Sequence, residues 1–89
     1  MNTMRHNQRL TFDQLRVEAE VAIQRYKAQP GQSQKTLAEE MGRTPGYISR
    51  AKKETGPLIA AMQIEILQHL TDFDILEERT FRAVRRDRK

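Results

Sequence analysis

The chain has 89 residues, no cysteine and no tryptophan, and its formal net charge is +4. This length predicts one small domain, and the lack of cysteine excludes disulfides, thiolate catalysis and cysteine-ligated zinc. The longest apolar run, Leu58 to Met62, is far shorter than the ~20 residues that span a bilayer, and the polar N-terminus has no apolar signal segment. We therefore expect an intracellular protein with no membrane partner.

The first predicted helix follows a polar N-terminus. Residues 1–10 show no hydrophobic period, so we expect a flexible arm. Between Phe12 and Tyr26 the apolar residues recur in steps of three and four, which predicts a helix over about 11–28. Thr11 and Gln14 have the spacing of a capping box at its start, and Pro30 with Gly31 ends it.

Two short helices are predicted next. Ser33 is a good N-cap for a helix over 34–41, and Gly42 supplies the left-handed residue that a sharp stop requires. Thr44 is a second N-cap, and Pro45 suits the first position of a helix over about 45–54. Two short helices joined by a three-residue turn predict a helix-turn-helix, inside a core of residues 11–57.

Residues 58–89 are predicted to be helical as well. Leu58 to Leu70 is apolar on more than one face, and Thr71 or Asp72 can cap a last helix with Phe73, Leu76, Thr80 and Val84 along one side. No strand alternation is recognised. The predicted fold is therefore an all-α, compact bundle of about five helices.

An oligomer is expected from the small size of the domain. A chain of this length buries only about 60% of its unfolded surface, so added burial between subunits would stabilise it. Ile64 and Leu67 project away from the main apolar stripe of their helix, and Phe81 lies on the last one. We expect these three residues to form a homodimer or a higher homo-oligomer.

The charges are sorted into blocks. Residues 43–53 carry four basic residues and no acid, residues 54–78 six acids and no Lys or Arg, and residues 79–89 six basic residues with one Asp. The last block is open to two interpretations, a solvated helix end favoured by the helix dipole or a clamp on flanking phosphates.

The helix-turn-helix segment resembles a known superfamily. Gln34, Ala38, Gly42, Thr44 and the run Ile48-Ser49-Arg50 are similar to the phage lambda repressor and Cro-like helix-turn-helix proteins. The run from Gly42 through Lys52-Lys53 also looks like the CII-like activators. The resemblance implies a compact all-helical domain that binds double-stranded DNA, acts as a dimeric transcription regulator on symmetric operators, and works in the cytoplasm of a bacterial or phage-infected cell.

The resemblance also implies residue roles. Gln34 would touch a phosphate, Thr44 and Gly46 would lie at the mouth of the major groove, and Arg50 could pair with guanine. The departure is Pro45-Gly46, where family members often place a base-reading side chain. The predicted DNA-binding set is Gln34, Arg43, Thr44, Gly46, Tyr47, Ser49, Arg50, Lys52 and Lys53. Tyr47 is open to two interpretations, a contact with DNA or packing at the rim of the helix-turn-helix.

The expected function is repression by a phage or mobile-element regulator that binds DNA as a homodimer. The alternatives are a CII-like activator that touches RNA polymerase, a protein-interaction module such as an antitoxin, and an architectural DNA-binding accessory. No enzyme activity, catalytic residue, metal or cofactor is expected. His6 and His69 are isolated, and the acids between Asp72 and Glu78 are better explained as the start of a helix.

Overall fold

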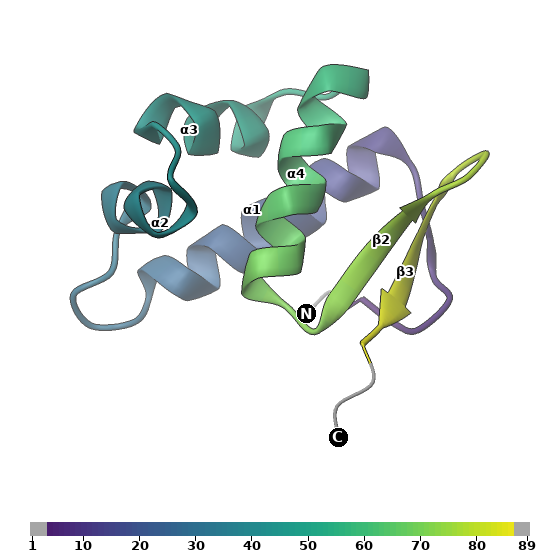
Figure 1. Ribbon diagram of the computed structural model, residues 1–89, viewed down its shortest axis with the longest axis horizontal. Helices are drawn as coiled ribbons and strands as arrows, with labels where there is room; N and C mark the ends of the chain where they lie inside the picture. Colours follow the sequence, from purple (N-terminus) through teal and green to yellow (C-terminus); the bar gives the residue numbers. More distant parts are fainter. Residues whose placement is uncertain (1–3, 87–89) are drawn as a thin grey trace.

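The computed structural model describes residues 4–86, which form four helices and a three-stranded antiparallel sheet. In chain order the elements are β1 (Arg9–Leu10), α1 (Phe12–Lys27), α2 (Gln34–Met41), α3 (Pro45–Lys53), α4 (Pro57–Leu70), β2 (Phe73–Glu77) and β3 (Phe81–Arg85). Figure 1 shows α1 and α4 between the sheet and the α2–α3 pair. The first three helices lie within a residue of their predicted bounds.

The prediction of an all-α bundle of five helices was wrong, because residues 73–85 form a β-hairpin. Phe73 pairs with Arg85 and Ile75 with Ala83 across β2 and β3. Phe73, Ile75 and Ala83 are buried, whereas Leu76 is exposed. The buried residues therefore follow the period of two of a strand. The predicted helix face of Phe73, Leu76, Thr80 and Val84 does not form.

The predicted flexible arm is also corrected from Met4 onward. Met4 and Leu10 are buried, and β1 pairs with β3 in the sheet order β1-β3-β2. The Asn7 N–H donates to the Ala83 carbonyl at 2.7 Å, and the Ala83 N–H donates to the Gln8 carbonyl at 2.9 Å. Residues 4–10 thus belong to the sheet and its core, and the first three residues of the predicted arm lie outside the described residues.

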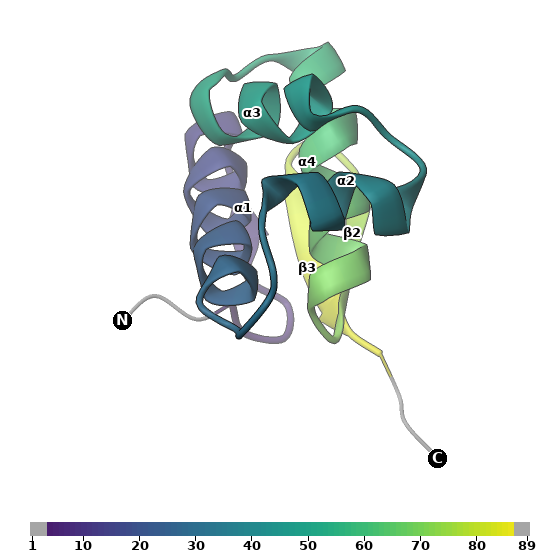
Figure 2. The same cartoon turned by 90° about the vertical axis from the view of Figure 1, so that its left-hand side faces the viewer.

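The apolar core has two parts on opposite sides of α1 and α4. One part joins α1 and α4 to the sheet and contains Met4, Leu10, Leu15, Ala22, Ala60, Ile64, Leu67, Phe73, Ile75 and Ala83. The other joins them to α2 and α3 and contains Ile23, Tyr26, Leu37, Ala38, Ile48, Ala51 and Ile66. The two middle helices are therefore apolar on two sides because each has a layer of the same chain on both (Figure 2).

This arrangement corrects the predicted oligomer contact. Ile64 and Leu67 are only 8% and 0% exposed, because both pack on the sheet of their own chain. Phe81 is half-buried, packs against the same part of the core, and meets the Phe12 ring edge-on at 5.4 Å between centroids. Ile64 and Leu67 therefore leave no surface for a second copy. Among residues 4–86, no helix has both the length and the apolarity needed to cross a membrane.

Candidate DNA-binding surface

The ends of α2 and α3 are defined by the caps that the sequence predicts. The Ser33 hydroxyl accepts a hydrogen bond from the Thr36 N–H at 3.2 Å, and the Thr36 side chain accepts one from the Ser33 N–H at 2.8 Å. Thr44 caps α3 by accepting from the Tyr47 N–H, with Pro45 at the first helical position. These bonds satisfy N–H groups that a helix leaves without a partner at its start.

The turn between the two helices depends on Gly42. Its φ of 67° and ψ of 33° are left-handed, as predicted. This conformation lets the Arg43 N–H donate to the Ala38 carbonyl at 2.8 Å, the six-to-one bond of a Schellman motif. The turn sets the direction of α3 relative to α2, and Figure 2 shows the two helices joined by this short loop.

The inner faces of the two helices are held by close packing. Leu37, Ala38, Ile48 and Ala51 are fully buried in the part of the core that includes Ile23 and Ile66. A fully buried aliphatic side chain contributes about 1.5–3 kcal/mol relative to an exposed one. Burial of these side chains therefore stabilises α3 in this orientation on the domain.

The outward face of α3 is polar and cationic. Thr44, Gly46, Arg50 and Lys53 are exposed, and Ser49 is half-exposed. The Arg50 guanidinium lies 3.4 Å from the Glu54 carboxylate one turn away, and both side chains are about half exposed. An exposed pair of this kind is worth roughly 0.3–0.5 kcal/mol, so Arg50 can leave Glu54 for a stronger partner at little cost.

Two residues of the predicted DNA-binding set, Gln34 and Lys52, lie together. The Lys52 ammonium donates to Gln34 Oε1 at 2.8 Å, which joins the start of α2 to the last turn of α3. Because lysine can only donate, this bond assigns the amide oxygen of Gln34 to Lys52. The amide nitrogen of Gln34 takes no part in this bond.

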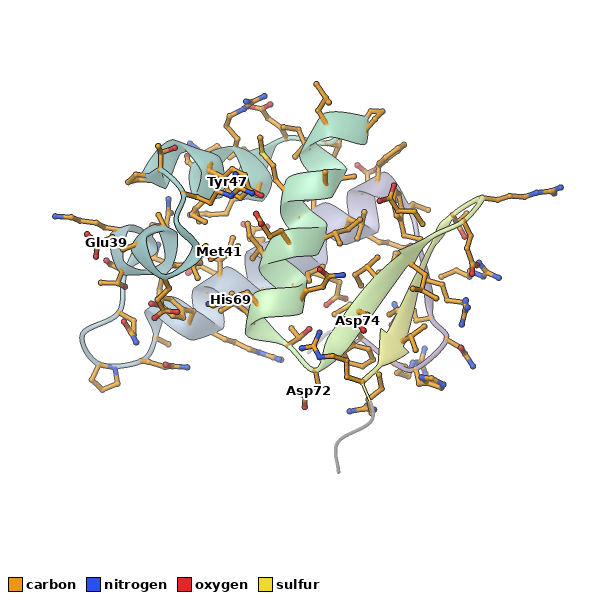
Figure 3. The ribbon with its side chains drawn as sticks, in the orientation of Figure 1. Glu39, Met41, Tyr47, His69, Asp72 and Asp74 are labelled. Atoms are coloured by element: carbon orange, nitrogen blue, oxygen red, sulfur yellow. The ribbon has the colours of Figure 1, made fainter. Side chains whose placement is uncertain are left out.

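Arg43 lies in a different environment from the one predicted, and Tyr47 packs at the rim of the helix-turn-helix, which is one of its two interpretations. Arg43 donates to both carboxylate oxygens of Glu65 on α4, at 3.1 and 3.0 Å, and its guanidinium lies 4.8 Å from the centre of the Tyr47 ring. The Tyr47 hydroxyl also donates to Glu65. Figure 3 shows Tyr47 on the α4 side of α3. These two residues attach α3 to α4, so we do not place them among the base-reading residues.

The charges of this cluster stabilise one another. The hydrogen bonds from Arg43 and then from Tyr47 lower the pKa of Glu65 below its ordinary value. Burial, with the hydrogen bond to Glu65 as the next cause, raises the pKa of Tyr47 to about 12. The carboxylate and the neutral phenol therefore both persist at physiological pH.

Two contacts that position the helix-turn-helix were not foreseen. Gln63 on α4 is fully buried, and its side-chain N–H groups donate to the carbonyls of Ala51 and Glu54 at 2.8 and 2.9 Å. These carbonyls lie at the end of α3, where a helix leaves acceptors without a partner. Gln63 thus caps α3 from another helix. A glutamine among apolar residues was the only sequence signal for it.

A second unforeseen contact ties α1, α2 and α4 together at Glu40. The Tyr26 hydroxyl donates to Glu40 Oε2 at 2.7 Å, and His69 Nε2 lies 3.0 Å from Glu40 Oε1. The hydrogen bond with His69, followed by that from Tyr26, lowers the pKa of Glu40. The three residues are 14 and 29 positions apart along the chain, so no local pattern indicates the contact. His69 is labelled in Figure 3.

The basic block near the C-terminus is part of the hairpin, not the end of a helix. Arg82 and Arg9 both pair with Glu78, at 3.1 and 2.6 Å. Arg86 pairs with Asp74 at 2.7 Å and donates to the carbonyls of Gln68, Phe73 and Thr71. Two of the acids predicted to begin a helix, Asp74 and Glu78, therefore pair with arginines of β1, of β3 and of the residue after β3. Asp87, Arg88 and Lys89 lie outside the described residues.

Comparisons of the chain with known protein families, with curated proteins and with solved structures found no match. Within residues 4–86, no group of three or more His, Asp or Glu side chains is arranged to hold a metal ion. The candidate function therefore depends on the residues of the helix-turn-helix and their geometry.

Proposed function

We propose that this chain is a sequence-specific DNA-binding transcription regulator whose α3 enters the major groove. The observation that carries the proposal is a closely packed helix-turn-helix whose outward face combines Thr44, Gly46, Ser49, Arg50 and Lys53. The groove is about 12 Å wide and admits one α-helix. The nine residues of α3 are about 13 Å long, which suits three or four base contacts.

Each polar group has a role within this proposal. Arg50 leaves Glu54 and forms a bidentate pair with O6 and N7 of a guanine. Thr44 and Ser49 donate hydroxyl hydrogens to base edges or phosphates near the first turn of α3. Gln34 and Lys52, already in contact with each other, bind one phosphate between them. Because Pro45 and Gly46 read no base, part of the specificity comes from the shape of the DNA.

We further propose that the regulator is a repressor that binds a symmetric operator as a homodimer. Repression requires only occupancy of the site, whereas activation requires an additional surface for RNA polymerase. The dimer contact has to use exposed residues, which excludes Ile64 and Leu67. Two recognition helices on one face of DNA are spaced one helical turn, about 34 Å, apart.

The proposal is tested by fluorescence anisotropy with a duplex that the protein selects from a random pool. Arg50→Ala should weaken binding by about 1–3 kcal/mol and relax one base position, and Lys53→Ala should lower the salt slope by about 0.9. Arg5→Ala is the matched control, because Arg5 is exposed and precedes β1, in a part of the chain that lies away from α3 in Figures 1 and 2. Equal losses in Arg50→Ala and Arg5→Ala would contradict the role of α3.

A further inference from the structure

The three cations in the last turn of α3 differ in what they contact. Lys52 donates to the amide oxygen of Gln34, and Lys53 is exposed. Within residues 4–86, Arg50 is the one of the three that pairs with an acid: its guanidinium lies 3.4 Å from the carboxylate of Glu54. The most important cation of the proposed recognition helix is therefore the one whose charge is already balanced.

The backbone of Glu54 is held in place on both sides. Its N–H donates to the Arg50 carbonyl at 2.9 Å, and its carbonyl accepts from the buried Gln63 side chain, also at 2.9 Å. Side chains four positions apart on a helix are neighbours. The carboxylate is therefore presented to Arg50 from a fixed point at the end of α3.

Glu54 is also the first acid after a cationic surface. Residues 43–53 carry four basic residues and no acid, and the Glu54 side chain is 48% exposed. A duplex that lies against the outer face of α3 brings its phosphates towards this charge. The Glu54 carboxylate repels them and cancels the charge of Arg50, so it opposes the part of the affinity that does not depend on sequence.

The acceptors that DNA offers to Arg50 are not equivalent. A phosphate is a solvent-exposed anion, and the Glu54 carboxylate is a comparable one that is already within reach, so exchanging one for the other gains little. A guanine offers O6 and N7 in the groove, and these two atoms match the fork of the guanidinium in one plane. Guanine therefore competes with Glu54 better than a phosphate does.

We propose that Glu54 is a specificity-determining residue, which holds Arg50 away from the phosphates of non-specific DNA and releases it to a guanine. Glu54 acts through Arg50, so it is a positioning residue. It increases the ratio of specific to non-specific affinity rather than the affinity itself. The inference rests on the proposed function, in which Arg50 reads a guanine.

The test measures fluorescence anisotropy against salt concentration on two probes. One is the duplex that the native chain selects from a random pool, and the other is an alternating adenine–thymine duplex of the same length, which contains no guanine. On the second probe, Glu54→Gln should tighten binding by roughly two- to fivefold and steepen the salt slope by about 0.9, because Arg50 then neutralises a phosphate. On the selected duplex the slope should not change, because Arg50 already contacts a guanine.

Two further variants separate this role from a simple change of net charge. Arg50→Ala alone should leave the slope on the adenine–thymine duplex unchanged, whereas adding Arg50→Ala to Glu54→Gln should return the slope to its native value. Glu20→Gln is the matched control, because Glu20 pairs with Arg16 at the same four-residue spacing on α1. It makes the same charge change and should alter neither slope.

Three results would overturn the proposal. Glu54→Gln leaves the slope on the adenine–thymine duplex unchanged, or steepens both slopes equally, or Glu20→Gln steepens the slope as much as Glu54→Gln does. Failure of the proposed function has a different signature: the chain selects no duplex, or Arg50→Ala binds the selected duplex as tightly as the native chain, and this inference then fails with it.

Discussion

Replacing Gly42 by alanine tests whether the left-handed turn holds α2 and α3 in place. A Cβ at this position would meet no atom within 4 Å, so the cost is conformational alone. The left-handed conformation costs an alanine about 1–2 kcal/mol. Alanine also lowers the conformational entropy of the unfolded chain, which stabilises the folded state by about 0.4–1 kcal/mol and offsets part of that cost. Gly42→Ala should therefore lower the free energy of unfolding by about 1 kcal/mol.

Gly46→Ala is the matched control in the same motif. Gly46 is the second residue of α3, does not have a positive φ, and its added Cβ would meet only Thr44 Oγ1, at 3.9 Å. Alanine at a compatible helical position should raise the free energy of unfolding by about 0.4–1 kcal/mol. The two substitutions make the same chemical change, and we expect effects of opposite sign.

Urea unfolding followed by far-UV circular dichroism measures both variants. With a slope of about 1 kcal/mol per molar urea, the two midpoints should differ by roughly 1–2 M, with the native chain between them. If Gly42→Ala is as stable as the native chain, or if both variants lose the same amount, the left-handed turn does not constrain the motif as we infer.

Three further substitutions have defined outcomes. Gln63→Ala should cost about 2–3 kcal/mol, because it removes the bonds that end α3, whereas the exposed Gln68→Ala should stay within about 0.5 kcal/mol in the same urea assay. Glu18→Gln should raise the melting temperature near neutral pH, and this gain should disappear below about pH 4.5. The reason is that burial raises the pKa of Glu18 in the folded state, so the native chain loses stability as the pH rises through that pKa. A lower melting temperature of Glu18→Gln at neutral pH would contradict a cost of burying the charge of Glu18. Glu65→Gln should lower the melting temperature at neutral pH and reduce the decrease in melting temperature on acidification. The reason is that the lowered pKa of Glu65 contributes stability that is lost as the pH falls through it. If the melting temperature of Glu65→Gln falls in acid as much as that of the native chain, Glu65 contributes nothing to stability.

The sequence predicted the parts of the fold whose signals are local. Thr11, Ser33 and Thr44 each lie directly before a helix and bond to an N–H three residues later. Gly42 has the left-handed conformation expected at the end of α2. Such signals depend on backbone geometry within four or five residues, so tertiary packing did not override them.

The sheet could not be predicted in the same way. Leu10 pairs with Phe81, which is 71 positions later, and no local pattern in two residues indicates that strand. In residues 73–84 a three-and-four spacing competes with the alternation of Phe73, Ile75 and Ala83, and pairing with a partner strand decides between them. A short strand of mixed composition gains its stability from its neighbours rather than from propensity.

The candidate site was predicted in part. The residues on the outer face of α3 were identified from their order alone, because the helix period places them together. The role of Arg43 was not predicted and that of Tyr47 was left open, since both residues depend on Glu65, 22 and 18 positions away. The apolar second face of α4 was assigned to a partner subunit, because sequence shows how many faces a helix buries but not which layer covers each one.

Selection of binding sites from random DNA duplexes tests the proposed function most directly. We expect the native chain to enrich a short symmetric site with half-sites about one helical turn apart, and we expect Arg50→Ala to lose preference at one guanine in each half-site. An asymmetric or directly repeated site would instead favour a CII-like activator. Recovery of no preferred sequence would contradict specific DNA recognition by α3.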